Sequence, residues 1–267
     1  MDRRFVKVEK GLGPQGRVAV VRFDRGDNIN ALSQQAMREL RDVPREFEDD
    51  LETSVVILTG SAKAFSAGFD LKEGRERDAL SVGERIHRQR LGPKMCKAWQ
   101  DMDQVTIAAI EGHCIGGGAA LVVSLDFRTC GMTAHFRIPE VELGMNMSWG
   151  SIPRMLSLMG PARTKQAVIL ASDRISSVEA LDWGLVENVV ADGQALTAAM
   201  EFAEKIARQP PIPVRMSKAS VNRLAHALDD LAAHMDADQN ALTALTEDYK
   251  EGTSAFREKR KPVFKGR

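Results

Sequence analysis

The stretch VTIAAIEGHCIGGGAALVVSLDF, residues 105–127, determines the fold class. Its first six residues are mostly apolar and rich in β-branched side chains, which predicts a buried strand. Three consecutive glycines follow at positions 116–118, and the apolar run after them predicts a helix. A strand that leads through a turn into a helix is typical of parallel sheets covered by helices, because parallel strands need a crossover connection.

The chain on both sides of this stretch continues the alternation of strands and helices. Valine- and isoleucine-rich runs predict strands at 17–23 and 55–58, and further strands are predicted at 128–130, 136–138 and 185–190. Apolar residues at helical spacing predict helices after Ser33, over 75–103 with an interruption at Gly92-Pro93, and over 149–159 and 161–170. Pro44 is expected to bend or divide the first of these helices. The fold class is therefore α/β.

From about residue 195 the pattern becomes entirely helical, with four helical segments in succession. We therefore divide the chain into a core, residues 1–195, and a helical region, residues 196–267. A helical tail of this kind can cover a sheet edge or form a subunit interface. No sequence repeat of fixed period and no long linker indicates a further division.

Composition narrows the class of protein. Lys and Arg total 37, and so do Asp and Glu, so a globally basic nucleic-acid binder is disfavoured. The chain has 43% hydrophobic residues but no apolar run of the roughly 20 residues that span a membrane, and no secretory signal is visible. Three cysteines without a CxxC pair argue against a disulfide framework or a structural zinc site. We expect a soluble cytoplasmic protein.

The zero net charge is an average over two unlike parts. Residues 257–267 hold six Lys and Arg residues and one acidic residue, so this segment carries 6 − 1 = +5. The rest of the chain carries (37 − 6) − (37 − 1) = −5. A basic segment of this kind can bind a polyanionic ligand, although a solvated, cation-rich helix end would have the same sequence pattern.

Three short segments carry the candidate chemistry. FSAGFDLKE, residues 65–73, has small residues in a loop after a strand, which favours either a tight turn or close approach of backbone to a ligand. The glycines at 116–118 place free N–H groups at a helix start, where a phosphate or a developing oxyanion can bind. They do not fit the dinucleotide pattern GxGxxG, and the chain has no GxxxxGK[ST].

The third segment is FRIPEVELGMNMSWG, residues 136–150, in which Glu140 lies among apolar residues. Burial in apolar surroundings raises the pKa of a carboxyl group, so that it can exchange protons near neutral pH. A solvated loop glutamate is the simpler alternative. Ser148 could orient a water molecule, but a serine before a helical run is more often its N-cap.

Together these segments resemble the crotonase family of enoyl-CoA hydratases and isomerases. The resemblance covers nearly the whole chain and includes NAL at 30–32, AFSAGFDLKE at 64–73, IGGG at 115–118, PEVELG at 139–144 and AFREKRKPVF at 255–264. It implies a spiral core of repeated ββα turns that holds the acyl-CoA site, and a C-terminal all-helical trimerisation region that completes it. Homotrimers or dimers of trimers are expected.

The resemblance also assigns roles. The backbone N–H groups of Phe69 and Gly117 would hold the thioester oxygen as an enolate forms, and Glu140 would move the proton. Family hydratases usually carry another glutamate twenty positions earlier, where this chain has Ala120. A single carboxylate fits double-bond isomerisation or single-carboxylate hydration of an enoyl-CoA better than the two-glutamate mechanism. A catalytically weak CoA-thioester-binding homologue is the alternative.

The remaining expectations concern the ligand. Residues expected to contact the acyl-CoA are Ala31, Ala67, Gly68, Asp70, Leu71, Lys72, Gly116, Ser148, Phe256 and Lys259. Asp27 stands where the family commonly has a basic residue, which weakens the expected adenine contacts. Coenzyme A would be part of the substrate, with no tightly bound cofactor and no metal. RNA binding through the basic tail is least favoured, because no aromatic stacking platform accompanies it.

Overall fold

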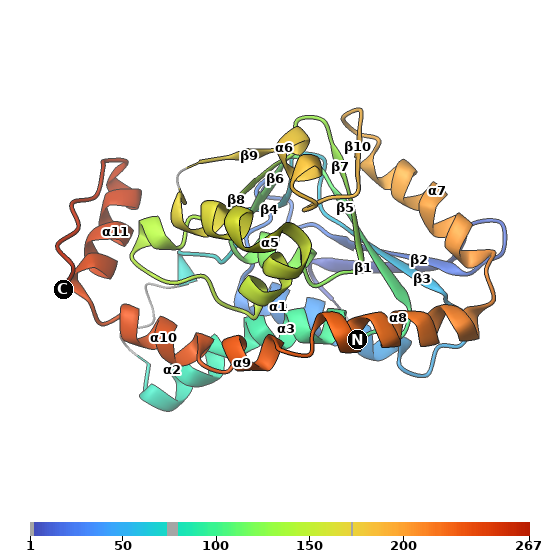
Figure 1. Cartoon of the computed structure of the whole chain (residues 1–267), viewed down its shortest axis with the longest axis horizontal. Helices are drawn as coiled ribbons and strands as arrows, with labels where there is room; N and C mark the ends of the chain where they lie inside the picture. The colour runs from blue at the N-terminus through green and yellow to red at the C-terminus, as the bar shows by residue number, and fades with distance from the viewer. Residues whose placement is uncertain (1–2, 74–79, 172) are drawn as a thin grey trace.

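The computed structural model describes residues 3–73, 80–171 and 173–267. The chain forms two β-sheets with helices packed around them (Figure 1). The larger sheet has the strand order β1-β2-β3-β5-β7-β10, and its bounds are β1 Val6–Leu12, β2 Val18–Phe23, β3 Val55–Thr59, β5 Val105–Ile110, β7 Phe127–Gly131 and β10 Asn188–Val190. The smaller sheet has the order β4-β6-β8-β9, with β4 Ala64–Ser66, β6 His113–Ile115, β8 His135–Arg137 and β9 Ile175–Ser176.

The two sheets are built together by a repeated unit. Three times along the chain, a strand of the larger sheet is followed by a strand of the smaller one: β3 by β4, β5 by β6, and β7 by β8. The larger-sheet members of these pairs are parallel to one another, and so are the smaller-sheet members. This is the ββα spiral that the resemblance implied. Its connections differ greatly in length, from 67–104 to 116–126, which explains the absence of a fixed sequence period.

The predicted strands of the larger sheet are confirmed at β2, β3, β5, β7 and β10. The strands β1, β4, β6 and β9 were not predicted. β1 is an edge strand with mostly exposed side chains, and the other three have only two or three residues. Such short strands have no periodicity to detect.

The helices before the glycine turn are α1 (Gln34–Asp42), the 3-10 helix η1 (Pro44–Phe47), α2 (Val82–Gln89) and α3 (Leu91–Gln100). Ser33 caps α1 by accepting from the N–H of Ala36, and Pro44 separates α1 from η1 as expected. The interruption in the 75–103 prediction lies at Arg90 rather than at Gly92-Pro93, because a proline is tolerated in the first turn of a helix. Part of that prediction, residues 75–79, lies outside the described residues.

The later helices are α4 (Gly117–Val122), the 3-10 helix η3 (Val141–Leu143), α5 (Ser151–Ile169), α6 (Ser177–Asp182), α7 (Ala195–Ala207), α8 (Pro211–Ala225), α9 (Asp229–Ala233), α10 (Asp236–Thr243) and α11 (Glu247–Glu258). α4 begins at the glycines and ends earlier than predicted. The predicted break between 149–159 and 161–170 is confirmed as a kink in α5 at Gly160, whose φ is 71°.

Helix α7 packs on one face of the larger sheet through a stripe of four alanines. Ala195, Ala199, Ala203 and Ala207 are buried and lie in one cluster with alternate residues of β2, β3 and β5. Small side chains at a spacing of four bring a helix close to a sheet. The first helix after residue 195 therefore contributes to the core. The division at residue 195 stays a prediction.

Figure 1 shows α8 to α11 continuing away from α7 along one side of the molecule to the C-terminus. Within the described residues, none of these or the other helices combines the length and apolarity needed to cross a bilayer. The three cysteines, Cys96, Cys114 and Cys130, are free thiols in the interior.

The carboxylate of Glu39 on α1 fastens the start of β1 to the core. It accepts from the N–H groups of Arg4, Phe5 and Val6 at 3.1, 2.8 and 3.1 Å. Burial alone would raise the pKa of Glu39, but hydrogen bonds from Gln35 and from these N–H groups outweigh it, and the pKa is lowered. The ionised form is therefore the one that stabilises the fold.

We predict that Glu39→Ala lowers the free energy of unfolding by about 2–4 kcal/mol at neutral pH, because three backbone donors lose a charged acceptor. A carboxyl group whose pKa is lowered on folding stabilises the fold at pH values above its unfolded pKa, which is near 4.5. This stabilisation is lost as the pH falls through the folded pKa. The difference between wild type and variant should therefore shrink in acid. Urea unfolding at several pH values measures it, with Glu48→Ala at an exposed position as the control. An equal loss in both variants would contradict this role.

Candidate active site

The candidate residues lie where three neighbouring strands end. Gly68 and Phe69 follow β4, Gly116 and Gly117 follow β6, and Glu140 follows β8. Strands β4, β6 and β8 are adjacent and parallel, so their carboxyl ends lie at one edge of the smaller sheet. The structure therefore brings together the three segments that were singled out in the sequence.

The two loops that carry the candidate oxyanion donors touch through their backbones. Gly68 has a φ of 83°, and a Cβ atom there would lie 2.7 Å from the carbonyl oxygen of Ile115 and 3.2 Å from the nitrogen of Gly117. Only glycine fits this contact. On its other side the loop bonds to the NAL segment, where the N–H of Leu32 donates to the carbonyl of Gly68 at 2.7 Å.

Two N–H groups at this contact have no protein acceptor among the described residues. The N–H of Gly117 is at the first position of α4, which leaves it outside the helix ladder. Phe69 lies between Gly68 and Asp70, which both form backbone hydrogen bonds with Leu32. The N–H of Phe69 donates to no described residue. Unpaired backbone donors beside a helix start can hold a developing negative charge.

Glu140 faces the glycine turn from η3. Its Oε1 lies 2.7 Å from the point that a Cβ on Gly116 would occupy, and Gly116 has a φ of 51°. Its Oε2 is buried and has no hydrogen-bond partner among the described residues. Burial raises the pKa of Glu140 to about 7, against smaller lowering effects from its own backbone N–H and from Arg137. A carboxyl group of this pKa can both accept and donate a proton near neutral pH.

Glu142 does not supply a second carboxylate at the position of Ala120, because it is paired elsewhere. Ala120 is completely buried inside α4. Glu142, the nearest candidate in sequence, forms an ion pair and hydrogen bond with the guanidinium of Arg137. Its carboxylate is therefore paired with Arg137, and among the described residues Glu140 is the carboxylate that faces Gly116 in the glycine turn.

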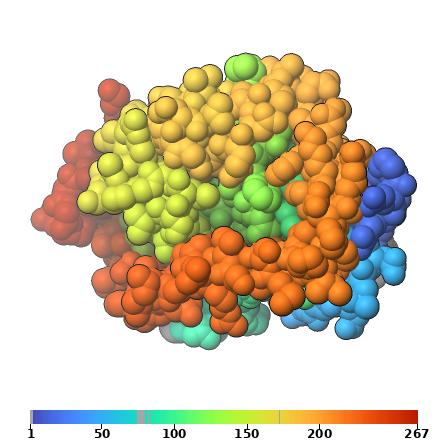
Figure 2. All heavy atoms as spheres, turned by 45° about the vertical axis from the view of Figure 1, so that its right-hand side comes forward, coloured from blue at the N-terminus to red at the C-terminus, as the bar shows by residue number. Residues whose placement is uncertain are grey.

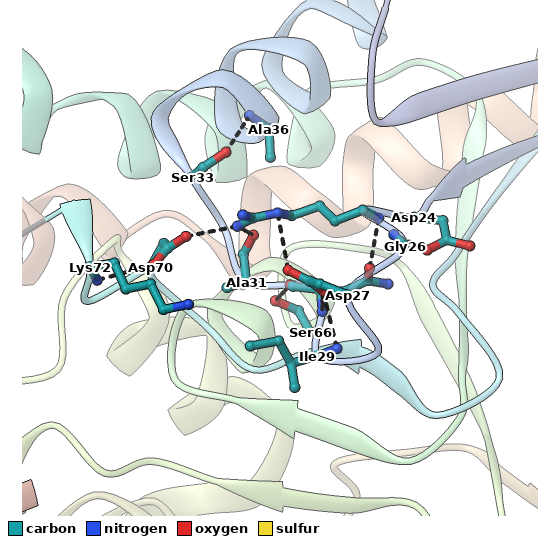
Figure 3. Close-up of polar contacts among 12 residues, drawn as sticks. Asp24, Gly26, Asp27, Ile29, Ala31, Ser33, Ala36, Ser66, Asp70 and Lys72 are labelled. Atoms are coloured by element: carbon teal, nitrogen blue, oxygen red, sulfur yellow. Dashed lines mark hydrogen bonds and ion pairs between the residues drawn. The ribbon is translucent and has the colours of Figure 1, made fainter. Parts of the chain in front are cut away.

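Asn30, the first residue of the NAL segment, ties the site to both sheets. It is completely buried with a φ of 48°, and its Nδ2 donates to the carbonyls of Phe23 at 2.9 Å and Ala64 at 3.2 Å. Its own carbonyl accepts from the hydroxyl of Ser66 at 2.7 Å (Figure 3). The end of β2 is thereby joined to β4, the strand that leads into the Gly68 loop.

The expected CoA contacts Ala31 and Asp70 are joined by Arg25 (Figure 3). Its Nη1 donates to the carbonyl of Ala31 at 2.7 Å and to Asp70 at 2.9 Å, and its Nε lies 3.3 Å from Asp27. Leu71 and Lys72 are exposed beside this group, and the N–H of Lys72 donates to Asp70. Ala67 is half-buried, with its N–H bonded to the carbonyl of Ile29.

Ser148 does not cap the following helix. Gly150 is the N-cap of α5, and no side chain caps it. The carbonyl of Ser148 instead accepts from the hydroxyl of Ser151 at 2.6 Å. The N-cap prediction for Ser148 is therefore wrong, because a left-handed turn at Trp149 and Gly150 separates Ser148 from the helix.

Phe256 and Lys259 lie at the end of α11, and the Phe256 side chain is 53% exposed. Helix α11 packs behind the Glu140 loop: a Cβ on Gly252 would lie 2.7 Å from the backbone carbon of Leu143, and one on Gly144 would lie 2.6 Å from the carbonyl oxygen of Asp248. The contact of Phe256 and Lys259 with coenzyme A stays a prediction.

Trp149 and Asp236 lie near the site, but neither was predicted from the sequence as part of it. Position 149 was interpreted only as the start of the helix predicted over 149–159, and Asp236 is far away in the sequence. Asp236 accepts from the N–H of Gly150 at 2.7 Å, and burial raises its pKa. No local pattern could have linked a carboxylate in α10 to a loop 86 positions earlier.

The histidines of β6 and β8 bond to each other, as Nδ1 of His113 lies 2.9 Å from Nε2 of His135. Within residues 3–73, 80–171 and 173–267, no three His, Cys, Asp or Glu side chains are grouped so that they could hold a metal ion.

Comparisons with known proteins show which sequences and folds the chain is similar to. The family model for enoyl-CoA hydratase/isomerase matches residues 13–267. The chain is 35% identical to a short-chain-enoyl-CoA hydratase of Clostridium acetobutylicum over 98% of this chain and 97% of the relative. It is 34% identical to a crotonyl-CoA hydratase of Syntrophomonas wolfei over 95% and 96%. A crystal structure of carnitinyl-CoA hydratase from Mycobacterium avium superposes over the whole of both chains, with a TM-score of 0.84 at 29% identity.

We predict that Asn30→Ala lowers the free energy of unfolding by about 2–4 kcal/mol. The buried carbonyls of Phe23 and Ala64 lose their donor, and the N–H of Arg25 loses its acceptor, Oδ1 of Asn30. Asn28→Ala is the matched control, since Asn28 is exposed and shares the left-handed conformation with a φ of 60°. It should lose no more than about 1–2 kcal/mol. Urea denaturation of both variants measures the difference. Equal losses would show that the conformation, and not the buried hydrogen bonds, is what Asn30 supplies.

Proposed function

The chain belongs to the enoyl-CoA hydratase/isomerase family, and we propose that it transforms an enoyl-CoA thioester with Glu140 as its only proton-transferring carboxylate. The observation that carries this proposal is the buried, unpartnered Oε2 of Glu140 beside the glycine turn. The N–H groups of Phe69 and Gly117 would hold the thioester oxygen. Each such donor in a dry site contributes about 2.7–4 kcal/mol to transition-state stabilisation.

Double-bond isomerisation is the reaction that this arrangement supports best. Ionised Glu140 takes a proton from C2 of a 3-enoyl thioester, and the electron pair moves into the thioester carbonyl to give a dienolate. The two N–H groups stabilise the oxygen anion. Protonated Glu140 then returns the proton to C4, and the double bond ends between C2 and C3. One carboxylate with a pKa of about 7 performs both steps in turn.

Single-carboxylate hydration is the second candidate, because the named relatives from Clostridium and Syntrophomonas are hydratases. Here Glu140 would remove a proton from water while the water oxygen attacks C3 of a 2-enoyl thioester. Protonated Glu140 would then give the proton to C2. Coenzyme A enters both reactions as part of the substrate. A CoA-thioester-binding protein with weak catalysis is distinguished from either by tight binding without turnover.

We predict that Glu140→Gln lowers kcat about 10²–10⁴-fold on whichever substrate the wild type uses. Crotonyl-CoA, a longer 2-enoyl-CoA and a 3-enoyl-CoA are offered, and the absorbance of the conjugated thioester is followed. Since Glu140 must be ionised to take a proton, kcat/KM of the wild type should rise with pH and reach half its plateau near pH 7. Glu142→Gln is the matched control and should retain turnover. Undiminished turnover in Glu140→Gln would overturn the mechanism.

We also propose that the protein is a cytoplasmic trimer or a dimer of trimers. Support comes from apolar side chains that point outward from the helices after α7, with Leu224 83% exposed and Leu231 71% exposed. Figure 2 shows α8 to α10 as a band along the lower edge of the molecule, open to solvent in that view. An apolar surface of this kind is typical of a subunit interface.

Light scattering after gel filtration should therefore give three or six times the chain mass of 29.4 kDa. Leu224→Glu combined with Leu231→Glu should dissociate the assembly, because two charges would be buried in the interface. Leu51→Glu, on an equally exposed leucine outside these helices, should leave the mass unchanged. A wild type with the mass of one chain would contradict the proposal.

A further inference from the structure

Trp149 has a backbone conformation that is unusual for its size. Its φ is 63°, in the left-handed region that bulky residues rarely occupy, and such strain concentrates at functional sites. The conformation is held from both sides. The Trp149 carbonyl accepts from Nη1 of Arg154 at 2.9 Å, and the N–H of Gly150 donates to Asp236 at 2.7 Å.

The indole of Trp149 fills a space left by two glycines. Its Cζ3 and Cη2 atoms lie 2.6 and 2.7 Å from the point where a Cβ on Gly117 would be. Its Cδ2 atom lies 2.5 Å from the corresponding point on Gly92 in α3. Any side chain at either glycine would displace the ring. The indole is half-buried, in contrast to the completely buried Trp99, so it is not a core residue of the usual kind.

The ring and the catalytic carboxylate face successive residues of the glycine turn. Gly116 faces Oε1 of Glu140, and Gly117 faces the indole together with Cδ1 of Leu32, 3.3 Å from the same Cβ point. A thioester whose oxygen reaches the N–H of Gly117, and whose C2 atom reaches Glu140, therefore places its next carbons against Trp149. The flat face of an aromatic ring suits a planar conjugated acyl group.

We propose that Trp149 is the specificity-determining wall of the acyl site and limits the substrate to short acyl thioesters. This inference rests on the proposed function, since it takes the thioester position from the Phe69 and Gly117 donors. Leu32 is completely buried and packs beside the ring at Gly117. Arg154 and Asp236 are positioning residues that hold the loop of Trp149 in place.

The first test compares kcat/KM for enoyl-CoA substrates with acyl chains of four, eight and twelve carbons. Trp149→Gly removes the indole, and glycine accepts the φ of 63° without strain, so the fold should be kept. The ratio of kcat/KM for the twelve-carbon substrate to that for the four-carbon substrate should rise at least 10-fold. Trp149→Phe should give a smaller rise. An unchanged ratio in Trp149→Gly would overturn the inference.

A second test moves the ring without replacing it. Gly92→Ala places a methyl group against the indole, whereas Gly83→Ala in the neighbouring helix meets no atom within 4 Å and is the matched control. Gly92→Ala should change the chain-length ratio, and Gly83→Ala should leave it as in the wild type. Equal ratios in the two variants would contradict contact between the acyl group and the ring.

A binding measurement separates this inference from the proposed function. Butyryl-CoA cannot undergo the reaction but should alter the tryptophan fluorescence of the wild type. The change should be lost in Trp149→Phe, although Trp99 and Trp183 remain. If no enoyl-CoA is turned over, the proposed function fails, and the fluorescence change still decides the role of Trp149. A change that persists in Trp149→Phe, or no butyryl-CoA binding by the wild type, would overturn the inference.

Discussion

The site depends on the parallel alignment of three very short strands. β4, β6 and β8 each follow a strand of the larger sheet, and their ladder fixes how closely the loops beyond them approach. At the closest point, the backbone of Gly68 lies against Ile115 and Gly117, where no Cβ atom could fit. Two N–H groups there have no protein acceptor among the described residues, so under the proposed function main chain, rather than mobile side chains, would set the position of the thioester oxygen.

The arrangement includes energetically unfavourable features, and interactions in the surrounding core compensate for them. Glu140 has a buried oxygen without a partner, and two non-glycine residues around the site, Asn30 and Trp149, have left-handed backbones. Each of these features is unfavourable by about 1–3 kcal/mol. They persist because buried hydrogen bonds, such as those of Asn30 and Asp236, hold the loops from outside.

The sequence predicts most of the larger sheet and the identity of the site segments, since long apolar strands and glycine turns have local signals. β3 and β5 are buried on both faces and read as continuous apolar runs. The three-residue strands β4 and β6 have no such signal, because their place in the sheet is set by neighbours far along the chain. The N-cap role of Ser148 failed for a related reason: the left-handed turn at Trp149 depends on Asp236 and Arg154.

The packing of α11 behind η3 has a consequence for how the protein is made. Gly144 and Gly252 bring the last helix into backbone contact with the loop that carries Glu140. Residues 247–258 are synthesised well after the glycine turn and Glu140, because they lie later in the chain. The strands can therefore pair before α11 has been made, but the loop of Glu140 gains its support only after residues 247–258 have been synthesised.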